Sequence, residues 1–179
     1  MSVTIRRARP DDVDFLVALL AHDEVAPYLA AVRPSSHEDV RALVERSRRE
    51  PDAFGLFVFE VEGERAGTVE FELVNRRSSI AALGGLAVHP DFRGRRVGDE
   101  DARLVQRHLL DDLGIHRLQL EIYAFNERAL AHAERVGFVR EGVRRQAYRR
   151  RGGWVDGVLF GLLREDLEGP PPTCPPAGR

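Results

Sequence analysis

The sequence predicts an α/β (α+β) fold in which helices cover both faces of one mixed, mostly antiparallel central sheet. The first observation is a hairpin pattern at 53–75, where two aromatic and β-branched runs flank a turn at 62–64. The second is a strand-like run at 78–90, an amphipathic run at 97–113 and another strand-like run at 117–124. The third is size, because 179 residues with 43% hydrophobic content suffice for one buried core and are few for two.

The N-terminal part predicts a short strand followed by two helices. Pro10 comes directly after the strand and fits the first position of a helix, where the two aspartates that follow it suit the positive end of the helix dipole. Ser36 and Asp39 form a capping-box-like pair at the start of a second helix over 36–50. The first helix continues with apolar residues at helical spacing, namely Val13, Leu16, Val17 and Leu20.

The second half predicts a long helix, a strand, a short helix and a closing hairpin. Apolar residues recur every three or four positions through 97–113, which predicts an amphipathic helix. After the strand, Asn126 can cap a short helix that reaches about Val136. Two further strand-like runs, at 138–148 and 154–163, predict the hairpin.

The chain divides into a folded part and a tail. Residues 1–168 carry all the predicted elements and are expected to form one domain. The tail at 169–179, GPPPTCPPAGR, is too rich in proline to pack and is predicted to be disordered.

Composition excludes several classes of protein. The net charge of -2 gives no overall field to hold nucleic acid, so such a partner is not expected. No segment approaches the roughly 20 apolar residues that cross a bilayer, and the start lacks a secretory pattern, so we expect a cytoplasmic protein without a membrane partner. The single cysteine, Cys174, allows no internal disulfide or cysteine metal cluster, and no metal site is predicted. An arginine cluster at 144–151 fits either phosphate or acidic groups, or the solvated face of a hairpin.

The stretch HPDFRGRRVG, residues 89–98, joins a strand to a helix with two glycines and three arginines. Unpaired backbone N–H groups and the helix dipole favour an anion at such a junction, and arginine side chains can add donors to phosphate oxygens. The stretch lacks the Gly-Lys-Ser/Thr ending of a Walker loop and the glycine spacing of a dinucleotide fingerprint. These absences argue against a nucleoside triphosphatase and a dehydrogenase.

Three segments resemble the GNAT acetyltransferase superfamily: LAVHPDFRGRRVG, NERALAHAERVGF and REGVRRQAYRRRGGWVDGVLFGLL. The resemblance covers about residues 3–167, and the last two segments are similar to the branch that holds ribosomal-protein N-terminal and polyamine acetyltransferases. It implies a GNAT-like acyl-CoA N-acyltransferase fold and direct transfer of acetyl from acetyl-CoA, as co-substrate, to a primary amine of a peptide or small molecule. It also implies a homodimer.

The resemblance also implies coenzyme-binding residues. Gly84-Gly85 would mark a bulge where the strand lets pantetheine pair with its backbone, or a plain packing site. Arg96 stands where the family usually has glycine, and its guanidinium either reaches the pyrophosphate or neutralises Asp99 or Asp101. The expected coenzyme-binding residues are Leu86, Ala87, Val88, Arg93, Gly94, Arg95, Arg96, Val97, Gly98 and Asn126, of which Val88 would also give a backbone N–H to the oxyanion and Asn126 could be only a helix cap.

Proton-transfer groups are harder to assign. Relatives place a tyrosine or a serine acid where this chain has Ala133 and Ala129. The alternative function is therefore a catalytically weak or idle acetyl-CoA-binding regulatory module. The candidate acids and bases are Glu121, Tyr123, Glu72 and Tyr148, with Glu70 on the same strand face as Glu72; each could instead be a solvated charge or a core tyrosine, and His89 and His132 fit surface groups.

Overall fold

A computed structural model describes residues 2–29, 36–94, 97–150 and 152–168, so the tail at 169–179 lies outside the described residues. Its seven strands form one sheet in the order β1-β2-β3-β4-β5-β7-β6, and every neighbouring pair is antiparallel except β4 with β5. The mostly antiparallel mixed sheet is therefore confirmed. The strands are β1 Val3–Arg7, β2 Phe54–Val61, β3 Glu64–Asn75, β4 Ile80–Val88, β5 Arg117–Tyr123, β6 Val139–Arg150 and β7 Gly153–Leu163.

The four predicted helices are present, two of them with different bounds, and the structure adds α5 and two short 3₁₀ helices that the sequence analysis did not predict. Pro10 opens a 3₁₀ helix, Pro10–Asp12, and α1 begins only after it. The helix predicted over 97–113 changes after Arg107 into a π-helical turn, His108–Asp112, because the Leu113 N–H bonds back to the His108 carbonyl. The helices are α1 Val13–Ala21, α2 His37–Arg49, α3 Val97–Arg107, α4 Glu127–Arg135 and α5 Arg164–Glu168, with short 3₁₀ helices at Ala26–Tyr28 and Pro90–Phe92.

Both predicted N-terminal caps are confirmed. The Ser36 hydroxyl accepts from the Asp39 N–H at 3.1 Å and the Asp39 carboxylate accepts from the Ser36 N–H at 3.1 Å, which completes the capping box of α2. At the start of α4, the Asn126 side-chain oxygen accepts from the Ala129 N–H at 3.3 Å.

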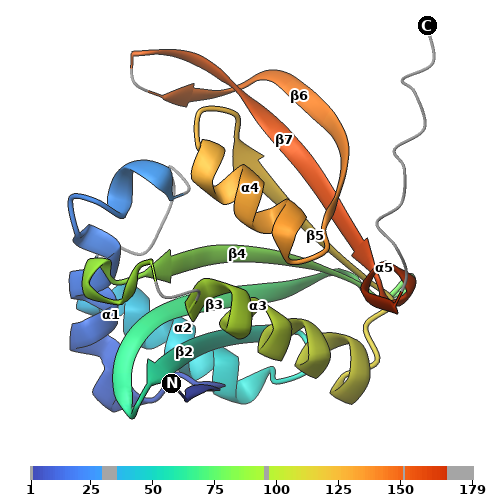
Figure 1. The fold of residues 1–179 in the computed structure, drawn as a ribbon. Helices are drawn as coiled ribbons and strands as arrows, with labels where there is room; N and C mark the ends of the chain where they lie inside the picture. Colours follow the sequence, from blue (N-terminus) through green and yellow to red (C-terminus); the bar gives the residue numbers. More distant parts are fainter. Residues whose placement is uncertain (1, 30–35, 95–96, 151, 169–179) are drawn as a thin grey trace, which may run out of the picture.

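Helices cover both faces of the sheet (Figure 1). The apolar residues of α1 and α2 pack with Phe54, Leu56 and Val58 of β2, while Phe57 between them joins the core beneath α3 and α4. This division follows from the strand alternation, which sends successive side chains to opposite faces.

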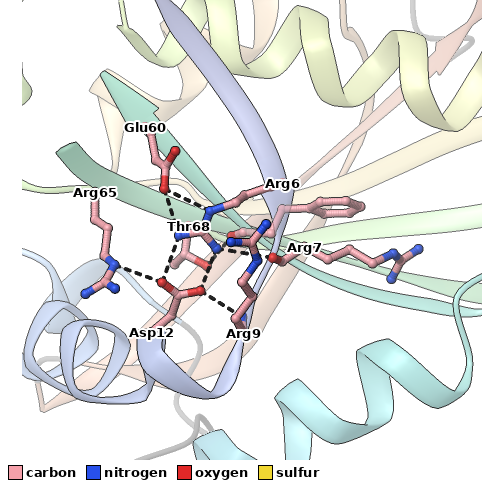
Figure 2. Close-up of polar contacts among 8 residues, drawn as sticks. Arg6, Arg7, Arg9, Asp12, Glu60, Arg65 and Thr68 are labelled. Atoms are coloured by element: carbon pink, nitrogen blue, oxygen red, sulfur yellow. Dashed lines mark hydrogen bonds and ion pairs between the residues drawn. The ribbon is translucent and has the colours of Figure 1, made fainter. Parts of the chain in front are cut away.

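A buried charge network fastens the N-terminal strand to the start of α1 (Figure 2). The side chain of Asp12 is 1% exposed and pairs with Arg6 at 2.6 Å and Arg65 at 2.9 Å. The Arg9 N–H also donates to it at 2.7 Å. Burial alone would raise the pKa of Asp12, but these hydrogen bonds and charges bring it below its ordinary value. The buried carboxylate is thus compensated by its partners.

The sheet opens between β4 and β5. The two strands pair in parallel from Ile80 with Arg117 to Ala82 with Gln119, and no further pairing follows in the described residues. They lie together near α5 and separate toward their C-terminal ends (Figure 1). The opening falls where ligands bind in α/β sheets, beyond the pairing and near the start of the crossover helix.

Candidate active site

A cavity of about 260 Å³ occupies the opening between β4 and β5. It is bounded by both strands, by α3 and α4, and by the segment that follows α1. Most of its wall is apolar, as is usual for small-molecule sites. The wall residues on which the site depends are Gly84, Gly85 and Leu86 of β4, Glu121 and Tyr123 of β5, Asp101 of α3, His132 and Ala133 of α4, and Asn126 and Tyr148.

A β-bulge forms the β4 wall of the cavity. Thr68 of β3 pairs with Ala87 and Glu70 with Gly84, so β4 carries one more residue than β3 between these pairs. Gly85 has a φ of +60°, in the left-handed region that favours glycine. The bulge expected at Gly84-Gly85 is confirmed. It exposes the backbone around Gly85 and Leu86 to the cavity.

The side chains of the three coenzyme-binding residues predicted on β4 have different surroundings. Leu86 lines the cavity, and it is 39% exposed. Ala87 instead packs in the core under α1 and α2, and Val88 packs beside the apolar cluster of Phe59 and Val97. Side-chain packing does not set the direction of a strand's N–H groups, so the Val88 N–H stays the predicted oxyanion donor. The His89 N–H donates to the Ala66 carbonyl of β3 at 2.8 Å, and strand alternation turns the Val88 N–H away from β3.

The Arg93 side chain forms hydrogen bonds within the protein that link the end of β4 to the loop after α1. Its guanidinium donates to the Val88 carbonyl at 3.2 Å and to the Glu24 carboxylate at 2.6 Å. A further bond reaches the Glu24 carbonyl at 3.2 Å. Each of the three nitrogens thus has an acceptor within the protein, so the side chain braces the loop after α1 against the end of β4. A guanidinium has five N–H donors, so two of them stay available for the predicted contact with phosphate.

The remaining junction residues form the start of α3. Gly94 has a φ of +81° and open space around it, which suits a backbone that faces an anion. Val97 is 1% exposed and anchors the helix in the apolar cluster. A Cβ on Gly98 would lie 3.5 Å from the His132 ring, an ordinary contact, so this glycine is not required by space. The predicted Arg95 and Arg96, and the question of what Arg96 contacts, lie outside the described residues.

The three carboxylates after the junction have different surroundings. Asp99 accepts two hydrogen bonds of 2.8 Å from Arg135 and one of 3.1 Å from His132, and the Arg135 bonds, ahead of other causes, lower its pKa. Burial lowers the pKa of His132, although Asp99 partly offsets this, so His132 is not the plain surface group expected from the sequence. Glu100 is exposed, whereas Asp101 is buried against the cavity. Asp99 therefore faces α4 with its charge neutralised.

Glu121, Tyr123 and Tyr148 are brought together at one end of the cavity. Arg144 of β6 donates to Glu121 at 2.9 Å, and the Tyr123 and Tyr148 rings meet edge to face with 5.1 Å between centroids. Burial, followed by the hydrogen bond and charge of Glu121, raises the pKa of Tyr148 to about 12. Arg150 lies over Tyr123 and donates to two carbonyls near the end of the Ala26–Tyr28 helix, so these two hairpin arginines have structural partners.

Glu72 is not part of the cavity wall. Its carboxylate is exposed and pairs with Arg46 of α2 at 2.6 Å. Glu70, two residues earlier on the same face, lies beside the bulge, since a Cβ on Gly85 would be 3.2 Å from its carboxyl carbon. It forms no hydrogen bond or ion pair within the described part of the chain, and burial, with Glu72 adding to it, raises its pKa. Strand alternation places both glutamates on the same face of β3, so it cannot tell which one lies at the bulge. The pairing of Glu70 with Gly84 shows that it is Glu70.

The remaining predicted residues, His89 and Asn126, both cap a helix or turn. His89 caps the turn that follows β4 by accepting from the Asp91 N–H at 3.4 Å, as expected of a surface group. Asn126 both caps α4 and lines the cavity. In the described ranges, no three His, Cys, Asp or Glu side chains could hold a metal ion, and no helix there is long and apolar enough to cross a membrane.

Comparisons with known proteins identify the family and the fold. A family model described as an acetyltransferase (GNAT) domain matches residues 2–139. The chain is 27% identical over 168 residues to the SPbeta prophage-derived uncharacterized N-acetyltransferase YokL of Bacillus subtilis, covering 93% of each chain. It is 36% identical over 85 residues to the ribosomal protein bS18 alanine N-acetyltransferase of Salmonella typhimurium, covering 46% of this chain and 55% of that one. The spermidine N-acetyltransferase of Vibrio cholerae, solved with CoA and spermine, shares the fold with a TM-score of 0.82 at 19% identity, over 93% of this chain and 98% of that one.

Proposed function

The chain belongs to the GNAT acetyltransferase family, and from this premise we propose that the β4–β5 cavity holds the reactive end of acetyl-CoA beside a primary amine. The family resemblance drawn from the sequence is confirmed, and with it an acetyl-CoA-dependent transfer of acetyl to amines. The observation that carries the placement is the separation of β4 from β5 after Ala82. It leaves the bulged backbone of β4 facing a cavity instead of a neighbouring strand.

The described residues fit the coenzyme. Gly94 and the N-terminus of α3 would hold the pyrophosphate, because backbone N–H groups and the helix dipole favour an anion there. Arg135 neutralises Asp99, a carboxylate in the first turn of that helix that would otherwise repel the phosphates. The bulged backbone at Gly85 and Leu86 would pair with the pantetheine arm, and the Val88 N–H would stabilise charge on the thioester oxygen.

Glu70 is the residue proposed to prepare the amine. An amine attacks a thioester only when it is uncharged, so a carboxylate of raised pKa near the bulge suits a general base. Glu70 faces the α2 side of the sheet, since Glu72 on the same strand face pairs with α2. Glu121 and Tyr148 would then line the acceptor path from β5 and β6.

The acceptor proposed is a primary amine of a peptide or a small molecule. The names of the relatives above give a ribosomal-protein alanine and spermidine as their acceptors, and both carry a primary amine. A cytoplasmic location and a homodimer belong to the same proposal, the first from the sequence and the second from the family. Cell fractionation and solution scattering measure these two properties.

Two measurements test the proposal. The first is calorimetry of CoA binding, for which we expect saturable one-site binding. The second is thiol release from acetyl-CoA with a panel of spermidine, an alanine-initiated peptide and an aminoglycoside. Binding with transfer to at least one amine supports the proposal. Binding without transfer to any of them supports the idle module, for which Ala129 and Ala133 in the cavity wall argue. Absence of binding would overturn the placement of the coenzyme.

A further inference from the structure

Asp101 is a buried carboxyl group on α3 for which the described part of the chain supplies no partner. The residue is 0% exposed, and neither oxygen has a hydrogen-bond partner among the described residues. It nevertheless forms part of the cavity wall, from the α3 side. A buried polar group without a partner costs folding free energy, so such a group in a cavity wall points to something that enters the cavity.

The reaction needs a proton at this place. Acetyl transfer breaks the bond between the acetyl carbon and sulfur, and the electron pair goes to sulfur. A neutral acid within an apolar cavity stabilises that charge better than water would. Glu70 lies toward the α2 face of the sheet, whereas Asp101 approaches from α3 on the opposite face. Asp101 thus lines the cavity from the α3 face, while the Glu70 carboxyl group lies beside the Gly84-Gly85 bulge of β4 on the other face.

We propose that the Asp101 carboxyl group donates its proton to the sulfur of the departing coenzyme. This rests on the proposed function, because acetyl-CoA must occupy the cavity. The amine nitrogen forms the new bond to the acetyl carbon, the carbon–sulfur bond breaks, and the Asp101 proton goes to sulfur, which yields CoA as the thiol and Asp101 as the carboxylate. Glu70 takes the surplus proton of the nitrogen and releases it to solvent. After CoA leaves, Asp101 takes a proton from solvent and the cycle closes.

The protonation state of Asp101 suits this role. Burial raises its pKa to about 8, near that of a thiol, so the group is an acid at neutral pH and a matched donor for a thiolate. The titratable groups that share the cavity wall are Tyr28, Glu121, Tyr123, Tyr148 and His132, and Asp99 lies on the same helix. Of these, Tyr148 is the other possible donor, but its hydroxyl contacts Arg144 at 3.4 Å and interacts with Glu121.

Disulfide capture tests the position of Asp101 without any acceptor amine. In a Cys174→Ser background, the Asp101→Cys variant is treated with the mixed disulfide of CoA and methanethiol, and the product is identified by mass spectrometry. We expect the thiolate introduced at position 101 to attack the CoA sulfur, which gives a protein–CoA disulfide and methanethiol. Excess CoA should block this capture. Glu100→Cys, at the exposed neighbouring position, is the matched control, and its reaction with the reagent should not respond to excess CoA. Capture at position 101 that excess CoA does not block, or no capture by an Asp101→Cys variant that still binds CoA, would overturn the proposal.

The pH dependence of the rate tests whether Asp101 donates the proton. With the best amine of the panel, the wild-type rate should fall as pH rises through the pKa of Asp101. Asp101→Asn should lose that falling limb and transfer acetyl about ten- to a hundredfold more slowly at pH 7, with unchanged affinity for CoA. Glu100→Gln should behave like wild type. If wild type transfers acetyl and Asp101→Asn keeps both rate and profile, only the role of Asp101 fails; if wild type does not bind CoA, the proposed function fails as well.

Discussion

Arg135 of α4 clamps Asp99 of α3 through two hydrogen bonds of 2.8 Å each. The clamp joins the two helices that flank the cavity, and the Asp99 side chain is only 8% exposed within it. It also neutralises one negative charge at the helix end where the coenzyme phosphates are proposed to bind. One ion pair thus supports both the packing and the site.

Arg135→Ala should therefore weaken stability and coenzyme binding together. Of its partners among the described residues, Asp99 would keep His132 alone. The loss should be about 1–2 kcal/mol of unfolding free energy, because Arg135 is half exposed and water screens part of its contribution. Affinity for CoA should also fall, and the fall should shrink at high salt. Urea unfolding and calorimetry at two salt concentrations measure both effects. Arg135→Ala with unchanged CoA affinity would mean that Asp99 does not influence the phosphates.

The Arg93 brace makes a separate prediction. If its guanidinium serves only Glu24 and Val88, then Glu24→Ala and Arg93→Ala should lower CoA affinity by similar, small factors, and the double variant should be no worse than Arg93→Ala alone. A direct phosphate contact would make Arg93→Ala much the more damaging single change. Calorimetry on the four proteins of this cycle decides between a brace and a ligand.

The two glutamates of β3 give a matched test of the general base. Because the pKa of Glu70 is raised above its ordinary value, the rate should rise with pH through that higher pKa as the carboxylate forms. Glu70→Gln should remove this rising limb and lower kcat by about a hundredfold or more. Glu72→Gln should leave the limb intact, since Glu72 is engaged with Arg46. The same profile from both variants would exclude Glu70 as the base.

Local signals sufficed for much of the fold. The Ser36–Asp39 pair and Asn126 are caps whose partners lie three residues away, so sequence alone finds them. The π-helical end of α3 was not predictable, because the apolar spacing through 97–113 fits an α-helix and carries no mark of the wider turn. The order of the strands likewise depends on contacts distant in sequence.

The site was less predictable for the same reason. Strand alternation does not distinguish Glu70 from Glu72, because both lie on the same face of β3. The arginine-rich sequence of the junction does not show that Arg93 pairs with Glu24, which is distant in sequence. Asp101 did have a signal, since Val97, Asp101 and Val105 follow one another at four-residue spacing on one helix face. A carboxylate between two valines on the buried face breaks the amphipathic pattern, and such breaks concentrate at functional sites.

The buried Asp101 also predicts how stability depends on pH without any ligand. Its pKa is about 8 in the folded protein and near its ordinary value when unfolded, so between these values the folded state holds one more proton. Its contribution to stability is therefore fully present below the unfolded pKa and is lost as pH rises through the folded pKa of about 8. Asp101→Asn removes this dependence, and at pH 9 it should be more stable than wild type by about 1–3 kcal/mol, the cost of an unsatisfied buried group.

The comparison of two pH values makes this last prediction decisive. The gain from Asp101→Asn should shrink at pH 5, where the wild-type carboxyl group is protonated in the folded state, and Glu100→Gln should show neither the gain nor the dependence. Urea unfolding of the three proteins at both values of pH measures this. A gain equal at pH 5 and pH 9 would mean that Asp101 does not titrate as a buried acid. A variant that is more stable but slower than wild type would indicate that the carboxyl group is kept for the reaction at the expense of stability.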